Sequence, residues 1–402
     1  MGNSIFKPLS LSCLAALGVG GMQAASALEP ANLQAGPVFV TPTLDSYLEY
    51  VDNLFRTPDD EKSSGVSILK PRVQAWVENG LNTYSLAYTL IDTRYFDSRD
   101  DNYTDNQLNL DIYHEFNAKN AANFYAEYFA GHEERGTGLS EGIPELISEP
   151  VEFDRATVGG DYTYGSSSSR GRIKLAAKAK EIEYQNFREE TIYRDYDQYG
   201  YDTTFFWKVA SRTDVLAEVR YQDTEYNKVD PLAVDGDLNS NEYNYFVGVA
   251  WDATAKTSGS VKVGGYERQY DSSARDDNSG FSWDVKASYK PRTYSEFTLS
   301  SRRFSEETNG QGDAINSNRT ELAWDHKWSG RSSTDLSLAY LNSDYAGTER
   351  EDDQYEVAAA YNYAMRRWLD LGFGYRYEDR SSSLNFYDYT RNTAFIRATV
   401  SL

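Results

Sequence analysis

A row of basic residues recurs at alternating positions near the middle of the chain. Arg172, Lys174, Lys178 and Lys180 follow Arg170 and are separated by apolar or small residues. Because alternate residues of a strand point to the same face, this spacing places all of the cations on one face. If this strand lines a channel, the row predicts either a cationic track for an anionic solute or a set of salt bridges that keeps the polar interior of the channel hydrated.

Further basic residues fall on the polar face of other predicted strands. Acidic residues such as Glu218 and Asp284 are interleaved with them. The two interpretations therefore both stay open, and they differ in ion selectivity, which the lumen charges of a channel set. The candidate lumen-lining basic residues are Arg172, Lys174, Lys178, Lys180, Lys208, Arg220, Lys262, Lys286, Arg302, Arg376 and Arg397.

No catalytic motif accompanies these charges. His114 falls on a predicted lipid face, His132 at a strand end and His326 between two tryptophans, which is typical of residues at a membrane interface. The sequence lacks a nucleophile elbow, a phosphate loop and a zinc-protease motif. Residues 235–239 begin like a calcium loop, but Phe246 stands where the bidentate Glu is needed. We expect no enzyme, no cofactor and no dedicated metal site, and weak cation binding by acidic loops stays open.

Composition restricts the class of protein that carries these residues. The 402 residues include 62 acidic and 40 basic side chains, and the 33 Tyr, 18 Phe and 7 Trp bring aromatics to 14%. A mean hydropathy of −0.67 excludes a bundle of membrane helices, and the aromatic content argues against disorder. A net charge of −22 makes nucleic acid a poor partner.

The N-terminus has the pattern of an export signal. Lys7 precedes a short apolar stretch, and Ala25-Ser26-Ala27 has the form of a signal-peptidase site. We expect a signal peptide over residues 1–27 and a single barrel domain over 28–402. Cys13 is the only cysteine, so the mature chain would have no disulfide.

From about Thr43 onward the residues alternate between apolar and polar with the period of a strand. Leu336, Leu338 and Tyr340 share one face, for example, and Asp335 lies on the other. Short links alternate with long acidic loops, which is typical of an outer-membrane barrel. We expect an all-β, antiparallel, up-and-down transmembrane barrel of about eighteen strands, with sixteen as the second choice and both termini in the periplasm. The expected strands begin near residues 43, 66, 83, 104, 121, 154, 172, 199, 213, 241, 258, 280, 295, 318, 333, 353, 368 and 389.

Two segments leave a question open. The loop over residues 136–152 contains apolar residues and could fold inward as a constriction or pack outside the barrel. The final strand, from Asn392 to Leu402, resembles the C-terminal signal that the barrel-assembly machinery reads, although Leu402 replaces the usual aromatic. A soluble secreted β protein is the alternative, but it would need a more continuous core.

The beginning of the predicted barrel resembles the β-barrel porin 2 family. In that family a P-x-L strand leads into Y-x-D-N, then a loop and L-x-P. Here Tyr50-Val51-Asp52-Asn53 and Leu69-Lys70-Pro71 match that pattern. The resemblance singles out Asp52, Asn53 and Pro71 and is specific over about residues 36–130.

The resemblance implies an outer-membrane conduit of an exopolysaccharide or capsule secretion system, beside a periplasmic polysaccharide-export protein. An anionic polysaccharide would be the cargo, and outer-membrane lipid and lipopolysaccharide the surroundings. A general or small-solute porin is the alternative, and a structural or adhesive barrel is a third. An exporter should have aromatic or basic rungs in its lumen, whereas a general porin usually has a long inward loop with crossed charges.

Overall fold

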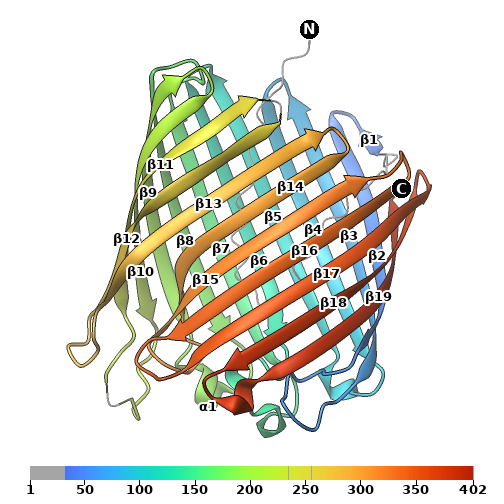
Figure 1. Cartoon of the computed structure of the whole chain (residues 1–402), viewed down its shortest axis with the longest axis vertical. Coiled ribbons are helices and arrows are strands. Elements are labelled where there is room, and N and C mark those ends of the chain that lie inside the picture. The colour runs from blue at the N-terminus through green and yellow to red at the C-terminus, as the bar shows by residue number, and fades with distance from the viewer. Residues whose placement is uncertain (1–31, 234, 255, 402) are drawn as a thin grey trace.

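A closed antiparallel ladder forms the wall of the protein in the computed structural model, which describes residues 32–233, 235–254 and 256–401. Strand β2 (Val38–Val51) pairs with β3 (Ser64–Asn79), each later strand pairs with the next, and β19 (Tyr389–Ser401) returns to β2. Strands β2 to β19 thus make a barrel of eighteen strands, whose first strand begins and last strand ends at the same end (Figure 1). The predicted fold class is confirmed.

The other strands are almost all long enough to cross a membrane. Besides β2, β3 and β19 they are β1 (Leu33–Ala35), β4 (Asn82–Tyr95), β5 (Tyr103–Asn117), β6 (Asn120–Glu133), β7 (Val151–Tyr164), β8 (Gly171–Tyr184), β9 (Tyr196–Ala210), β10 (Thr213–Tyr226), β11 (Ser240–Thr254), β12 (Thr257–Tyr270), β13 (Asn278–Arg292), β14 (Ser295–Glu307), β15 (Ala314–Lys327), β16 (Ser332–Tyr345), β17 (Glu351–Arg366) and β18 (Leu369–Ser382). The helices are short and lie in loops: η1 (Arg99–Asp101), η2 (Gly138–Ser140), η3 (Pro144–Leu146), α1 (Arg188–Thr191) and η4 (Asn385–Tyr387). No described helix is long and apolar enough to cross a membrane.

Every barrel strand begins within five residues of its predicted start, and the largest difference is at β2. Pro42 lies inside β2, just beyond the last pair with β19, Thr43 with Ser401. Its missing N–H is therefore not needed by β19. The short strand β1 was not predicted, and it pairs with β2 beyond that point. The predicted signal peptide, residues 1–27, lies outside the described residues.

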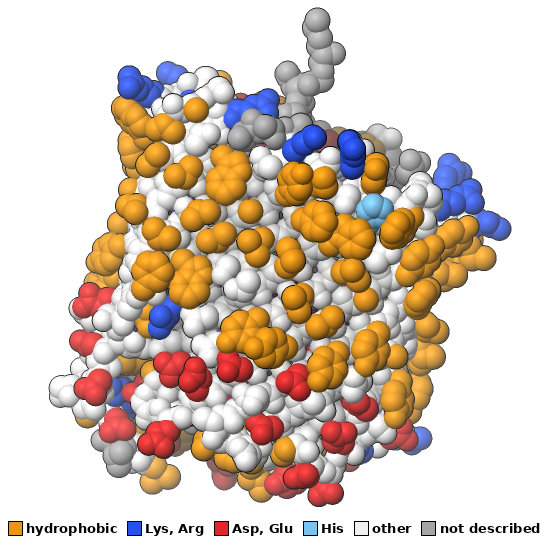
Figure 2. All heavy atoms as spheres, viewed as in Figure 1, with side chains coloured by type: hydrophobic (Ala, Val, Ile, Leu, Met, Phe, Trp, Pro, Cys, Tyr) orange, Lys and Arg blue, Asp and Glu red, His pale blue; other side chains and the backbone are white. Residues whose placement is uncertain are grey.

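The outer surface carries an apolar band between two rims of opposite charge. Figure 2 shows hydrophobic side chains across the wall, acidic side chains near one rim and basic ones at the other. The acidic rim carries the long loops, and we call it the outer end; the short turns form the inner end (Figure 1). This is the arrangement of an outer-membrane barrel with its short turns in the periplasm.

The junction between β13 and β14 departs from the regular ladder. The two strands pair only from Asp284–Arg302 toward the inner end. Beyond that point Ser282 Oγ donates to the carbonyl oxygen of Arg303 at 3.3 Å, and Arg268 of β12 reaches Glu307 of β14 at 3.1 Å. Ser282 and Arg268 stand at lumen-facing positions, so the outer half of β14 lies on the lumen side of β12 and β13.

The topology predicts which loops impermeant reagents reach on intact cells. Asp276 and Glu349 are exposed in outer-end loops, and Lys119 and Gly330 are exposed in inner-end turns. We expect a membrane-impermeant maleimide to label Asp276→Cys and Glu349→Cys, and to label Lys119→Cys and Gly330→Cys only after the cells are lysed. The reverse pattern would overturn the orientation.

Candidate functional site

The basic row lies along β8 and contacts groups on neighbouring strands. Arg172 Nη2 donates to Asp214 Oδ2 at 2.6 Å, and Lys174 Nζ lies 3.4 Å from Asp161 Oδ1. Lys180 Nζ donates to the hydroxyl of Tyr196 at 2.8 Å, and Lys178 stands on the same face. The structure thus places the row in the lumen, with two of its cations paired to acids.

A second group of charges spans the lumen wall from β10 to β13. Arg220 of β10 and Lys262 of β12 both contact Glu218 of β10 and Asp284 of β13. The Lys262 Nζ to Asp284 Oδ2 distance is 2.8 Å, and Arg220 Nη2 lies 2.9 Å from the same oxygen. Two cations and two anions balance, so this group stabilises the wall without adding net charge.

The other predicted lumen residues also lie on inward-facing positions, with varied partners. Lys208 donates to the carbonyl oxygen of Ser167, Arg376 lies 3.4 Å from Glu356, Arg397 donates to Asn362 Oδ1 at 2.6 Å, and Lys286 is exposed within the lumen. The mixture corresponds more closely to a salt-bridged lumen than to an unbroken cationic track. The role of these residues in conduction stays a prediction.

Several lumen cations also lie over aromatic rings of the same wall. A cation within about 6 Å of a ring centroid is attracted by the ring quadrupole. These cation–aromatic rungs are Arg155 over Phe129 at 5.2 Å, Arg172 over Phe206 at 5.1 Å, Lys180 over Tyr196 at 4.7 Å, Arg220 and Lys262 over Phe246 at 5.0 and 5.6 Å, and Arg302 over Phe304 at 4.1 Å.

The loop between β6 and β7, residues 134–150, reaches across the outer mouth. Its Glu141 carboxylate accepts hydrogen bonds from Arg350 Nη1 at 3.0 Å, from Arg380 Nη1, and from Asn309 Nδ2 at 2.7 Å. These donors come from β18 and from the loops before β15 and β17, far around the barrel from β6. The loop therefore folds inward, which settles the alternative that its sequence left open.

The guanidinium of Arg350 is the most enclosed group of this mouth. It lies 3.5 Å from the ring centroid of Tyr387 and 4.0 Å from that of Tyr345, and it is 1% exposed. Arg350 also donates to Gln311 Oε1 at 2.9 Å and to Asp352. Burial alone would lower the pKa of Arg350, but its hydrogen bond to Asp352 and the charge of Glu141 raise it.

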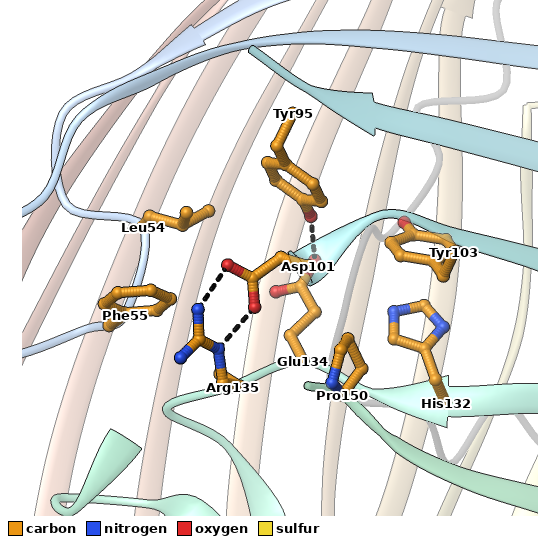
Figure 3. A pocket seen from close by; sticks show the side chains of 9 residues that line it. All are labelled: Leu54, Phe55, Tyr95, Asp101, Tyr103, His132, Glu134, Arg135 and Pro150. Atoms are coloured by element: carbon orange, nitrogen blue, oxygen red, sulfur yellow. Dashed lines mark hydrogen bonds and ion pairs between the residues drawn. The ribbon is translucent and has the colours of Figure 1, made fainter. Parts of the chain in front are cut away.

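The base of the same loop is tied to the barrel by a separate ion pair. Arg56 Nη1 donates to Glu134 Oε2 at 2.8 Å, and Figure 3 shows Tyr95 directed at Glu134 beside the Arg135–Asp101 pair. Burial alone would raise the pKa of Glu134, but its charged neighbours, Arg56 first and then Arg391, together with the hydrogen bond from Arg56, outweigh burial and hold the pKa at about 2.

The lowered pKa of Glu134 predicts how the loop responds to acid. Because the pKa of this carboxyl falls from 4.5 to about 2 on folding, its stabilising contribution is complete above pH 4.5 and is lost as the pH falls toward 2. We expect amide exchange in residues 134–150, corrected for intrinsic rates, to be equal at about pH 7 and 5 and faster below about pH 3. Faster exchange already at pH 5 would contradict this assignment.

Comparison with known proteins identifies the family. The model of the family described as "Putative beta-barrel porin 2" matches residues 26–402. The chain belongs to this family. It is an outer-membrane β-barrel of the porin-like channel class. No curated protein matches its sequence.

The porin 2 barrel also resembles solved outer-membrane barrels. The outer membrane protein opdK from Pseudomonas aeruginosa is 9% identical, with 90% of this chain and 99% of that chain covered and a TM-score of 0.48. OccK2 (OpdF) from Pseudomonas aeruginosa is 9% identical, covering 90% and 98%, with a TM-score of 0.49. The siderophore receptor PirA from Acinetobacter baumannii is 8% identical, covering 90% and 80%, with a TM-score of 0.45.

The family motif of the porin 2 barrel lies at the seam where β19 meets β2. Asp52 accepts hydrogen bonds from the backbone and side-chain nitrogens of Asn392, at 2.7 and 2.5 Å. Asn53 is fully buried, and its side chain bonds to the backbone of Thr57 and to the carbonyl oxygen of Thr390. Pro71 is exposed opposite Leu44 on the lipid-facing side. The hydrogen bonds of Asp52 thus join the end of β2 to β19, and those of Asn53 hold the chain where it leaves β2.

Removing the Asn53 amide should weaken this closure. Asn53→Ala deletes three hydrogen bonds of a fully buried side chain, to the carbonyl oxygens of Thr57 and Thr390 and from the N–H of Thr57, so we expect a loss of about 2–4 kcal/mol in stability. Urea unfolding of the barrel in lipid vesicles would measure the loss. Asn79→Ala in an exposed inner-end turn is the control and should change stability by less than about 0.5 kcal/mol. Equal midpoints for both variants would refute the role given to Asn53.

The histidines of this barrel contact neighbouring aromatic and polar side chains. His114 Nδ1 lies 2.9 Å from the Tyr84 hydroxyl, and His326 lies between Trp324 and Trp328. His132 Nδ1 lies 2.9 Å from Asp105, and the centroid of its ring lies 3.5 Å from that of the Tyr103 ring. Among the described residues, no group of three or more potential ligands is arranged to hold a metal ion.

The sequence did not single out the residues that close the mouth. Glu141, Arg350 and Arg380 stand among many charged loop residues, and no local period distinguishes them. The only signal was the apolar content of the 136–152 loop, which marked the segment and not its partners.

Proposed function

We propose that this channel conducts an acidic carbohydrate across the outer membrane, and that its physiological cargo is an exopolysaccharide or capsular polysaccharide. The observation that supports the proposal most strongly is the set of cation–aromatic rungs in the lumen. Each ring lies behind its cation and holds it at the lumen wall, where the carboxylate of an acidic sugar can meet it. The rungs occur on strands from β6 to β14, so such contacts repeat along one half of the wall.

The acids between the rungs favour movement over tight binding. Arg172 and Lys174 already share their charge with Asp214 and Asp161. A polyanion would therefore meet many shallow sites, as conduction requires, because a chain held tightly at one site would block the channel. A periplasmic polysaccharide-export protein at the inner end remains part of the proposal.

A small-solute porin is the second candidate, and one observation favours it. The loop over residues 134–150 lies inward, and Glu141 meets Arg350 and Arg380 there as crossed charges. That arrangement is expected of a channel that filters small solutes by size and charge. Both candidates predict that the lumen cations influence the conduction of anions. They differ in the cargo, which is a polysaccharide in the first and small solutes in the second.

Neutralising the basic row separates the two candidates. With Arg172, Lys174, Lys178 and Lys180 all replaced by Gln, we expect an assembled barrel, selectivity shifted toward cations by about two- to fivefold in planar bilayers, and reduced release of an extracellular polysaccharide. The control replaces four exposed inner-end cations, Lys119, Arg331, Arg366 and Arg367, by Gln. It makes the same charge change outside the lumen and should leave polymer release unchanged.

The outcomes assign the cargo. Altered ion selectivity with normal polymer release would support the small-solute porin and overturn polymer export. Deletion of the gene is the coarser check, since normal polysaccharide secretion in the deletion strain, under conditions of expression, would also overturn it.

A further inference from the structure

The Glu141 carboxylate occupies a site that is built from the rest of the barrel. Three donors converge on its two oxygens: Arg350 Nη1, Arg380 Nη1 and Asn309 Nδ2. Glu141 and Arg380 are each 8% exposed, and Arg350 is 1% exposed. A buried arrangement of two guanidinium groups and an amide around one carboxylate has the chemistry of an anion-binding site.

The site retains donor capacity and positive charge beyond what Glu141 uses. Nη2 of Arg380 is buried and has no hydrogen-bond partner within the part of the chain that the structure describes. Asp352 is the other acid in contact with the two arginines, so without Glu141 the group would carry two cations and one anion. A buried cation without a counter-ion is costly, and the vacated site would therefore draw in another anion.

The arginines are held in place independently of Glu141. Arg350 lies against the rings of Tyr387 and Tyr345, while Arg380 Nε donates to the carbonyl oxygen of Tyr387 at 2.8 Å and its guanidinium lies 4.7 Å from the Tyr389 ring. These contacts come from the loops and strands of the opposite wall and do not involve residues 134–150. The donors are thus preorganised, which lowers the entropy lost when an anion binds.

We infer that Arg350, Arg380 and Asn309 form a carboxylate-binding subsite at the outer mouth, that Glu141 is its internal occupant, and that the carboxylate of an acidic sugar displaces Glu141 as it passes. The inference rests on the proposed function and names the group of the cargo that the site recognises. Displacement releases the tip of the 134–150 loop, while its base stays tied through Glu134 and Arg56. The solute thus shifts the mouth from closed to open by binding only the open state.

Replacing the internal occupant tests the subsite directly. In planar bilayers, Glu141→Gln should raise the fraction of time that the channel is open. It should also lower the glucuronate concentration needed for binding by at least about tenfold, because the tethered Glu141 carboxylate competes at an effective concentration of about millimolar or more. Glucuronate binding is read as interruptions of the ionic current, and glucose is the neutral probe. Glu145→Gln, exposed on the same loop, is the matched control and should behave like wild type.

Two further variants secure the interpretation. Arg350→Gln should abolish the interruptions by glucuronate, and Asn309→Ala should give a smaller increase in open time than Glu141→Gln, with the charge of the site unchanged. If Glu141→Gln fails to assemble, the loss of glucuronate interruptions in Arg350→Gln carries the test. Unchanged glucuronate affinity in Glu141→Gln and in Arg350→Gln, or equal interruptions by glucose, would overturn the subsite and leave Glu141 with a structural role alone.

The subsite and the proposed cargo fail in different experiments. If glucuronate competes with Glu141 but the deletion strain secretes polysaccharide normally, the subsite stands and the polymer cargo is wrong. If the deletion strain loses its polymer but Glu141→Gln leaves the glucuronate affinity unchanged, the proposed cargo stands and the subsite is wrong.

Discussion

Closure of the backbone ladder is the constraint on which the rest of this structure depends. A strand edge facing lipid would leave N–H and C=O groups without partners, so a sheet can cross the bilayer only when its last strand meets its first. Here that junction joins β19 to β2 from Val51–Thr393 to Thr43–Ser401. Asp52 and Asn53 extend it by side-chain bonds to Asn392 and to the carbonyl of Thr390.

Once the ladder is closed, the alternation of side chains decides where every charge lies. Alternate residues face lipid and must be apolar, so the charged residues of the strands collect in the lumen. Charges in so confined a space must find partners, which explains why Arg220, Lys262 and Asp284 share one network. At the outer mouth the same requirement explains why the loop over residues 134–150 folds inward. Arg350 and Arg380 need the carboxylate of Glu141 in addition to that of Asp352 as counter-charges.

The wall was predictable from sequence because its information is local. A period of two residues fixes the strand, its lipid face and the positions of Arg172 and Lys174, and short turns bring neighbouring strands into register. The mouth was not predictable, because Glu141 meets Arg350 across 209 residues and Arg380 across 239. No periodicity relates such loop residues. Asp52 and Asn53 were found only through family resemblance, since a single Asp-Asn pair looks like any turn.

The irregular junction between β13 and β14 connects the wall to the mouth. Beyond Asp284–Arg302 the two strands no longer pair, and the Ser282 hydroxyl donates to the carbonyl oxygen of Arg303 instead. The Glu307 carboxylate accepts hydrogen bonds from Arg268 and from the Tyr226 hydroxyl on the lumen side. The inward displacement of β14 carries the following loop inward as well, and that loop supplies Asn309 to Glu141 and Gln311 to Arg350. A fully regular barrel would keep this loop at the rim, away from the centre of the mouth. The break in the ladder is therefore part of the construction of the carboxylate subsite, because it brings the amide donor within reach of a loop that starts on the other side of the barrel.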